Sequence, residues 1–408
     1  MSKTDDNVRE RYEELKASGL ALDMTRGQPS DEQFALSNKM ITALGEDSYK
    51  SKSGMDCRNY PGGVLGLEDA REVFGPIIGV PAEQTIVGNN SSLSMMHNVL
   101  SWLMLRGACG VEEPWFGKSV KFICTVPGYD RHFTMLESLG IEMIPVVLGD
   151  NGPDVKEIQQ LVGNDASIKG LITVPQYNNP VGMTFSDEVV IELADLQPKA
   201  KDFTIIWDNA YAIHDIEKDN ERVKNILSCC RDLGCPERAI VFSSTSKVTF
   251  SGGGLGFMGA SEANIKYFQK LFTSQMICPN KLEQLRQVKF FEKLKGGLEA
   301  HMKEHAKLVK PKFDAVYEAL DKELSGTELA QWSKPKGGYF ISLDVPEGKA
   351  KKVVELAAEA GVKLTPAGAT FPKGEDPEDR NIRISPTRPP LEDVKKAAEV
   401  LALCVKLA

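Results

Sequence analysis

The sequence predicts an α/β fold, with a mainly parallel central sheet in a large domain and a smaller α+β domain beside it. Short segments rich in Ile and Val, bounded by Gly, Pro, Asn or Ser, are typical of strands buried on both faces. Helical patterns separate these segments, and such alternation favours a parallel sheet with helices on both faces. The expected strands span residues 85–88, 121–125, 143–148, 170–174, 204–207, 239–242 and 255–259.

The two ends of the chain follow a different pattern. Residues 5–16 predict a charged amphipathic helix, and residues 281–326 predict long helices. Strands and helices then alternate over residues 338–343, 351–359, 381–384 and 391–405. We therefore expect an N-terminal segment (1–49) that joins the smaller domain, a large domain (50–280), and the rest of the smaller domain with an interdomain helix (281–408).

Composition excludes several classes of protein. Among 408 residues, 49 Lys and Arg stand against 57 Asp and Glu, so the net charge is −8, and we expect no nucleic-acid partner. Apolar runs stay well short of the ~18–20 residues of a membrane-spanning helix, and the N-terminus is too charged for a signal peptide. The eight cysteines show no zinc-ligand spacing and are expected to be reduced thiols. These features predict a cytoplasmic enzyme without membrane partner or metal.

Four polar segments follow predicted strands, at the edge where open α/β sheets bind ligands. Together they offer a polar helix start, a carboxamide, a carboxylate with a phenol, and an amine. These groups suit a Schiff-base cofactor that carries a phosphate and a ring nitrogen. The segments are VGNNSS (87–92), PQYNNPVG (175–182), WDNAY (207–211) and SSTSK (243–247).

Each of these residues also has a plainer interpretation. Lys247 is either an amine whose pKa is lowered in a cleft by a neighbouring cation and desolvation, or a solvated loop lysine. Asp208 is either the partner of a pyridinium N–H or a helix N-cap. Ser91 and Ser92 either bind a phosphate at a helix start or cap that helix. Asn179 either donates from its amide to the 3′-oxygen of the cofactor or lies in an ordinary Asn-Pro turn.

The order and spacing of these motifs give the sequence a family resemblance. Asn-Asn-Pro-x-Gly (178–182), Asp-x-x-Tyr (208–211) and Ser-x-x-Lys (244–247) resemble the class I aminotransferases that depend on pyridoxal 5′-phosphate (PLP) and have fold type I. The resemblance spans about residues 20–400. The segments TRGQPS, GNNSS and SGGGLGFMG resemble a divergent bacterial aspartate aminotransferase subgroup, related to the aminotransferase-like domains of MocR regulators.

This resemblance implies roles for individual residues. Lys247 would bind PLP covalently and move a proton between the substrate Cα and the cofactor C4′. Asp208 would keep the ring nitrogen protonated, Asn179 and Tyr211 would bind the 3′-oxygen, and Tyr129 would stack on the ring. The phosphate-binding positions would be Asn90, Ser91, Ser92 and Ser244.

The resemblance also implies how the substrate and a second subunit bind. Arg383 would grip the α-carboxylate bidentately, and the Gly27 backbone would approach the same group. Tyr60 would reach the phosphate in the neighbouring subunit, which implies a homodimer with shared active sites.

One position departs from the family pattern. The family has a phosphate-binding arginine eight residues after the lysine, where this chain has Leu255. The glycine-rich segment 251–259 could replace it through backbone N–H groups, or an arginine from elsewhere could do so. A dicarboxylic substrate needs a further cation, for which we favour Arg26. Arg388 and then Arg58 are the next candidates for that cation, and all three arginines are candidates for the phosphate.

The sequence thus predicts an aminotransferase that acts on an amino acid and a 2-oxo acid, with aspartate and 2-oxoglutarate as the favoured pair. A β-lyase, a decarboxylase or an aminotransferase with another donor would use the same residues. A ligand-sensing regulator module is a third class, although the single helix before residue 20 is too short for a helix-turn-helix. His301 and His305 lie one helical turn apart among Lys and Glu, which favours a solvated helix face over a zinc site.

Overall fold

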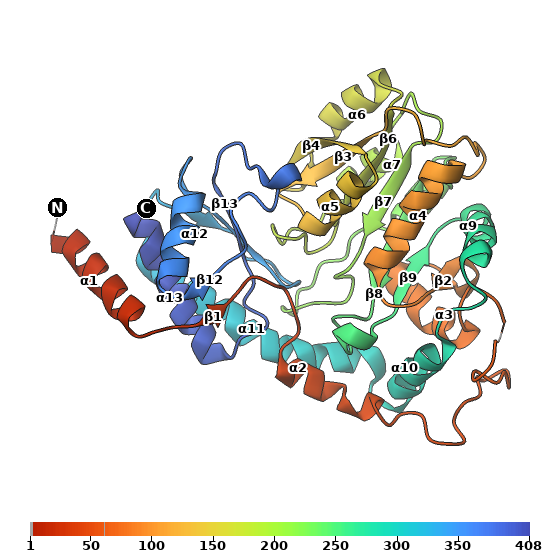
Figure 1. Ribbon diagram of the computed structural model, residues 1–408, viewed down its shortest axis with the longest axis horizontal. Coiled ribbons are helices and arrows are strands. Elements are labelled where there is room, and N and C mark those ends of the chain that lie inside the picture. The colour runs from red at the N-terminus through yellow and green to blue at the C-terminus, as the bar shows by residue number, and fades with distance from the viewer. Residues whose placement is uncertain (1–2, 61) are drawn as a thin grey trace.

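The computed structural model describes residues 3–60 and 62–408. Its largest element is an eight-stranded sheet of order β2-β9-β8-β7-β6-β3-β4-β5 (Figure 1). The neighbours from β4 through β3, β6 and β7 to β8 are parallel, whereas β2, β5 and β9 pair antiparallel. The predicted α/β class with a mainly parallel sheet is confirmed. The strands are β2 (Thr85–Val87), β3 (Lys121–Val126), β4 (Glu142–Gly149), β5 (Gly152–Pro153), β6 (Ile168–Thr173), β7 (Thr204–Asp208), β8 (Ala239–Ser244) and β9 (Gly256–Gly259).

Helices cover both faces of this sheet because successive side chains of a strand point to opposite faces. Along β7, Ile206 joins the hydrophobic core under one helical layer, whereas Ile205 and Trp207 join the core under the other. One layer contains α4 (Ser92–Arg106), α5 (Asp130–Ser138) and α9 (Glu262–Gln275). The other contains α3 (Glu68–Phe74), α6 (Val155–Asn164), α7 (Asp187–Ala194), α8 (Ile226–Asp232) and α10 (Lys281–Lys293).

A second hydrophobic core, the terminal core, joins the two ends of the chain. β1 (Leu22–Asp23) pairs with β12 (Val362–Lys363), and α1 (Lys3–Ala17) packs beside α13 (Leu391–Leu407) at one end of the molecule (Figure 1). An antiparallel sheet of β10 (Gln331–Trp332), β11 (Ile341–Asp344) and β13 (Asn381–Ile384) completes it with α12 (Ala350–Glu359). The domain boundaries at residues 50 and 280 stay predictions.

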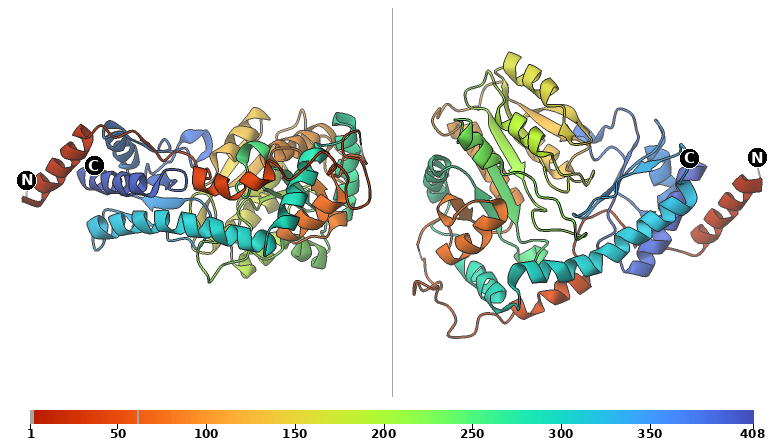
Figure 2. Two further views of the ribbon diagram at one scale, coloured as in Figure 1. Left: turned by 90° about the horizontal axis from the view of Figure 1, so that it is seen from below. Right: turned by 180° about the vertical axis from the view of Figure 1, so that it is seen from behind.

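Helix α11 (Gly297–Leu324) connects the two parts of the molecule (Figure 2). Met302 near its start packs in the core beside the large sheet, and Phe313 and Leu320 further along pack in the terminal core. The long helices expected over 281–326 are α10 and α11, which are separate because Gly296 adopts a left-handed conformation with φ of 82°.

Shorter helices complete the fold: α2 (Asp31–Leu36) and the 3₁₀ helices η1 (Asn38–Met40), η2 (Gly75–Ile78), η3 (Ala82–Gln84), η4 (Ser251–Gly253) and η5 (Pro372–Gly374). Within residues 3–60 and 62–408, no helix has the length and apolar character needed to cross a membrane.

Candidate active site

The candidate site lies at the carboxyl ends of β7 and β8, which are adjacent parallel strands. Asp208 is the last residue of β7, and Lys247 follows the end of β8 at Ser244. The topology therefore brings together two residues that the sequence places far apart. An aromatic cluster that includes Tyr211, Tyr339 and Phe340 packs beside them.

Asp208 is only 2% exposed, and its two carboxylate oxygens have different surroundings. Oδ2 accepts a hydrogen bond from His132 Nε2 of α5 at 2.9 Å. Oδ1 is buried and has no hydrogen-bond partner among the residues that the structure describes. A buried carboxylate oxygen without a partner is costly, so this atom is suited to accept a hydrogen bond from a bound ligand.

His132 is a site residue that the sequence analysis missed. It lies on the first turn of α5, and its ring contacts that of Tyr129 edge-on at 5.1 Å between centroids. Its partner Asp208 is 76 residues further along the chain. The spacing of the two residues in sequence carries no signal of this contact, which only the packing of α5 on the sheet creates.

Lys247 lies close to Tyr211, with its Nζ 5.1 Å from the centroid of the tyrosine ring. Burial lowers the pKa of the Lys247 amine, whereas the charge of Asp208 raises it. The expected desolvation is therefore present, but the expected neighbouring cation is not among the causes of the shift. Burial also raises the pKa of the Tyr211 phenol well above its usual value near 10, which keeps the phenol protonated as a hydrogen-bond donor.

Asn179 and Arg383 meet where the terminal core faces the large sheet. Arg383 lies in β13 with its side chain 7% exposed, and its Nη1 donates to Asn179 Oδ1 at 3.4 Å. The guanidinium lies 5.1 Å from the centroid of the Phe340 ring. Gly27 packs against the same ring, since a Cβ there would lie 2.4 Å from Phe340 Cζ. Gly27 and Arg383 therefore flank one aromatic side chain.

The residues expected at a phosphate gather around the start of α4. Ser91 is the N-cap and Ser92 the first residue of that helix, whose first-turn N–H groups and dipole favour an anion. A Cβ at Gly256 would lie 2.7 Å from Ser92 N, so only glycine allows this close approach. Asn90 Nδ2 donates to Ser251 O at 2.9 Å.

On the β8 side, Ser244 Oγ accepts from Ser246 N at 3.4 Å, and the buried Ser246 Oγ has no partner in the described part of the chain. Leu255 is 1% exposed and packs with Val248 and Phe257 in the hydrophobic core beside the sheet. Its side chain thus fills an apolar environment, where an arginine would be buried without a counter-charge.

The remaining predicted residues lie further out. The Tyr60 side chain is 73% exposed and lines a cavity of about 400 Å³ with Arg58, Cys278 and Lys281. Nη2 of Arg58 lies 2.7 Å from Oδ2 of Asp56, so the guanidinium already has a carboxylate partner.

Arg26 and Arg388 are exposed on two loops that are joined by a hydrogen bond from Thr387 Oγ1 to Gln28 O at 2.8 Å. The fold brings these two candidate arginines to the same region without placing either in a described contact with Arg383.

The prediction of a solvated face at His301 and His305 is wrong. Both imidazoles are buried, with 3.1 Å between their Nε2 atoms, and His301 Nε2 lies 2.8 Å from Val248 O, next to Lys247. Gln33 of α2 donates from Nε2 to His305 Nδ1 at 3.0 Å and to the Tyr339 hydroxyl at 2.9 Å. Pattern reasoning failed here because α2 and the loop after β8 cover one face of α11, whereas Lys303, Glu304 and Lys307 lie on the exposed face of the same turns.

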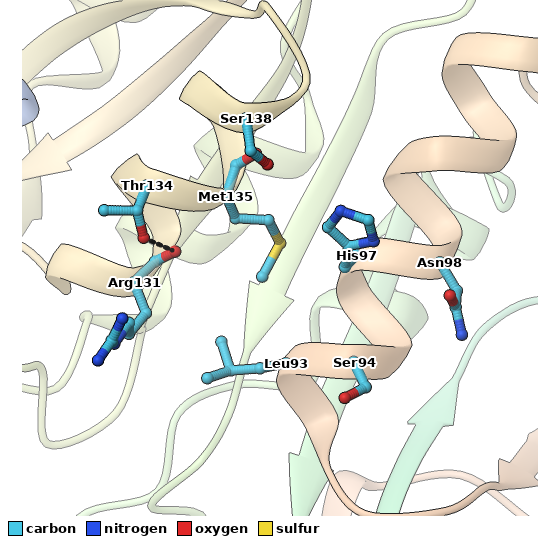
Figure 3. Close-up of a pocket in the computed structure, with 8 residues that line it drawn as sticks. All are labelled: Leu93, Ser94, His97, Asn98, Arg131, Thr134, Met135 and Ser138. Carbon is cyan, nitrogen blue, oxygen red and sulfur yellow. Dashed lines mark hydrogen bonds between the residues drawn. The ribbon is translucent and has the colours of Figure 1, made fainter.

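A larger cavity, of about 530 Å³, lies between α4 and α5 and is shown in Figure 3. Leu93 and Met135 point into it, and His97 and Arg131 lie on opposite sides. The predicted site residues are not among those that line it. In the described part of the chain, no cluster of His, Cys, Asp or Glu is arranged to hold a metal ion.

A mainly parallel α/β sheet with a lysine and a buried aspartate at adjacent strand ends defines the class: a PLP-dependent enzyme of fold type I. A family model described as aspartate amino-transferase matches residues 1–408, and the chain belongs to that family. An aspartate aminotransferase of Corynebacterium glutamicum is 41% identical over 404 residues, covering 99% of this chain and 93% of that protein.

Two further comparisons agree with this membership. The crystal structure of an aspartate transaminase from Corynebacterium glutamicum superposes with a TM-score of 0.95 at 40% identity, covering 99% of this chain and 95% of that one. An uncharacterized HTH-type transcriptional regulator of Bacillus subtilis is 21% identical over 388 residues, covering 94% of this chain and 74% of the regulator. The resemblance to aminotransferases and, more distantly, to such regulators is confirmed.

Proposed function

We propose that this aminotransferase transfers the amino group of aspartate to 2-oxoglutarate, giving oxaloacetate and glutamate. The proposed site rests on two neighbouring residues. Burial lowers the pKa of the Lys247 amine, and the buried Oδ1 of Asp208 has no hydrogen-bond partner among the described residues. The choice of aspartate is supported by the similarity to the Corynebacterium glutamicum aspartate aminotransferase.

The residues of the site fit PLP. Asp208 Oδ1 would accept the hydrogen bond of the protonated ring nitrogen, and Tyr129 would stack on the ring. Asn179 and the protonated Tyr211 phenol would bind the 3′-oxygen, since burial keeps that phenol a donor. Asn90, Ser91, Ser92 and Ser244 would bind the phosphate, together with backbone N–H groups at the start of α4.

When bound, PLP supplies an electron sink for the bond that breaks at the substrate Cα. Lys247 would take the proton from Cα and return it at C4′, a task for a neutral amine. Burial lowers the lysine pKa and so increases the neutral fraction at a given pH. Arg383 would hold the α-carboxylate, and this fixes which face of the substrate meets Lys247.

The substrate side chain and the second subunit belong to the same proposal. Arg26 is the first candidate for the side-chain carboxylate, with Arg388 next. The 73% exposure of Tyr60 is suited to a side chain that reaches the phosphate of a partner subunit, so we propose a homodimer with shared active sites. We further propose that the enzyme acts in the cytoplasm.

The test uses purified holoenzyme and two half-reactions. Aspartate alone should convert the cofactor to its amine form, and 2-oxoglutarate should restore the original absorbance; a β-lyase or decarboxylase would give a different product without this cycle. Borohydride reduction should fix the cofactor to Lys247, and Lys247→Ala should abolish both half-reactions while the variant stays folded. Full turnover by Lys247→Ala would contradict the assignment.

Substrate choice has its own test. With 2-oxoglutarate as acceptor, Arg26→Ala should lower kcat/KM for aspartate, and the loss should correspond to about 2–5 kcal/mol of transition-state binding. The kcat/KM for alanine should be unchanged. Arg388→Ala and Arg58→Ala test the next two candidates in the same way. Arg231→Ala, at an exposed arginine of α8 outside the candidate site, is the matched control. A wild-type preference for an apolar donor would exclude aspartate as the substrate but leave the aminotransferase assignment in place.

A further inference from the structure

Arg383 is held by a carboxylate of the protein itself. Its Nη1 lies 2.7 Å from Oδ1 of Asp130, the first residue of α5. The other contacts of Nη1 and Nε are longer, at 3.4 Å to Asn179 Oδ1 and 3.3 Å to Thr365 Oγ1. Asp130 is therefore the closest partner of the guanidinium and the only charged one within the described residues.

The α-carboxylate of a substrate needs the same group. A guanidinium has five N–H donors, and bidentate binding of a carboxylate uses two neighbouring ones. Nη2 has no partner among the described residues, so a bidentate contact needs one more N–H, from Nη1 or from Nε. One of the present partners must then give way: Asp130 or Asn179 on Nη1, or Thr365 on Nε.

Asp130 is the partner that can move. Asn179 is buried, and so is Thr365, whose hydroxyl is fixed by a hydrogen bond to Thr25 O at 2.9 Å. The Asp130 side chain is 32% exposed, so a rotation about its χ1 angle carries the carboxylate into water. There it still lies at the N-terminus of α5, where the helix dipole favours a negative charge. Arg383, by contrast, is 7% exposed and anchored in β13 against Phe340.

We infer that Asp130 is an internal carboxylate that neutralises Arg383 while no substrate is bound and releases it to the substrate α-carboxylate. This inference rests on the proposed role of Arg383. The buried arginine is then never left without a counter-charge, which would be costly. Two carboxylates on one guanidinium would repel each other, so binding of substrate and release of Asp130 are a single exchange. Asp130 is a positioning residue that sets the affinity for every carboxylate ligand.

The exchange lowers apparent affinity, because only the fraction of molecules with a free Arg383 binds ligand. Asp130→Asn removes the competing charge and keeps a side chain of the same size. We expect holoenzyme carrying this variant to bind succinate and propionate, which lack an amino group and cannot react, about five-fold or more tightly by calorimetry. KM for amino donors should fall by a similar factor, for aspartate and alanine alike, whereas kcat should not rise.

Two further variants separate this exchange from other effects. Glu137→Gln removes the same charge from an exposed position two turns further along α5, and should change succinate affinity by less than two-fold. In an Arg383→Gln background, Asp130→Asn should no longer tighten binding. Equal tightening by Glu137→Gln, tightening that persists without Arg383, or weaker binding by Asp130→Asn would each overturn the inference.

The same data distinguish this inference from the proposed function. Succinate and propionate binding does not depend on turnover, so the proposed aspartate reaction can fail while the affinity change is still observed. Conversely, an active aspartate aminotransferase whose Asp130→Asn variant binds succinate no more tightly would retain the proposed function and refute the exchange.

Discussion

Asp208 shows how much of a site depends on the surroundings of one side chain. Its Oδ1 is buried without a partner, and Oδ2 is held by His132 at 2.9 Å. The hydrogen bond from His132 fixes the carboxylate in one orientation, and in that orientation Oδ1 remains available. Both side chains are 3% exposed, so neither can exchange this contact for water.

We therefore expect His132→Ala to lower kcat by about ten- to a hundred-fold, the range found when a residue that orients a functional ligand is removed. The dissociation constant for PLP should rise as well, because Asp208 loses its fixed orientation. Steady-state kinetics and a PLP titration followed by absorbance measure the two effects. His97→Ala, which removes an exposed histidine of α4, is the control and should behave as wild type. Normal kcat and PLP affinity in His132→Ala would show that Asp208 needs no such support.

Replacement of the carboxylate itself gives a larger effect. Asp208→Asn keeps the shape but removes the charge that would stabilise a protonated ring nitrogen. We expect kcat to fall by several orders of magnitude, and a loss below ten-fold would count against the pairing, since loss of one electrostatic partner costs about 2.7–4 kcal/mol. The half-reaction with aspartate, followed by absorbance, isolates this step from product release.

At the same scale, the sequence predicts those residues whose position follows from a strand end. Asp208 directly follows one predicted strand, and Lys247 ends the short segment that follows the next, so the sheet rule places both at one edge. His132 and Asp130 could not be predicted in this way. Their partners, Asp208 and Arg383, lie 76 and 253 residues away in sequence, and the contacts depend on how α5 packs against the sheet and against β13.

Among the elements, α2 is short but central to the contacts behind Lys247. Ser30 and Gln33 form a capping box: Gln33 N donates to Ser30 Oγ, and Ser30 N donates to Gln33 Oε1 at 3.0 Å. This fixes the amide so that Nε2 faces His305 of α11 and the Tyr339 hydroxyl. Tyr339 in turn donates to Lys247 O at 3.3 Å. One glutamine thus joins the N-terminal segment, α11 and the lysine backbone.

Gln33→Leu should lower the free energy of unfolding by about 2–3 kcal/mol, because it removes half of the capping box and leaves the buried His305 Nδ1 without its partner. The Tyr339 hydroxyl loses one of its two hydrogen bonds and keeps the one to Lys247 O. Urea unfolding of the holoenzyme measures this. The control is Gln160→Leu, at an exposed position of α6, which should change stability by less than about 0.5 kcal/mol. A Gln33→Leu variant as stable as wild type would show that the contacts of Gln33 contribute nothing net.

The division between α10 and α11 shows why element boundaries are harder to predict than the elements. Residues 281–326 have one long helical pattern that contains Gly296, Gly297 and Pro311. Helix α11 continues through Pro311, whereas the chain divides at the glycine pair. A glycine pair is compatible with a continuous helix at a cost of about 1 kcal/mol each. Packing decides the outcome, since α10 contacts α3 beside the large sheet whereas α11 turns toward α13 in the terminal core.

At the scale of the whole molecule, three buried histidines make stability depend on pH. Burial lowers the pKa of His214 and His305 to about 3, and it also lowers that of His301. In the unfolded chain these residues titrate near 6.5. Between pH 6.5 and 3 the unfolded chain therefore binds more protons than the folded one, and stability falls as the pH falls. Above pH 6.5 both states are unprotonated at these sites and the effect is absent.

We expect each fully shifted histidine to lower the free energy of unfolding by about 1.4 kcal/mol per pH unit below 6.5. Carboxylates held at low pKa, such as Asp56 and Asp165 with values of about 2, contribute only below about pH 4.5, where their unfolded forms begin to protonate. Urea midpoints of the holoenzyme at pH 7.0, 6.0 and 5.0 therefore isolate the histidines. His305→Gln keeps an N–H donor but cannot titrate, so its stability should fall less steeply over this range. Stability that is constant or rises from pH 7.0 to 5.0 would mean that the three imidazoles become protonated without unfolding, and that the core behind Lys247 admits water.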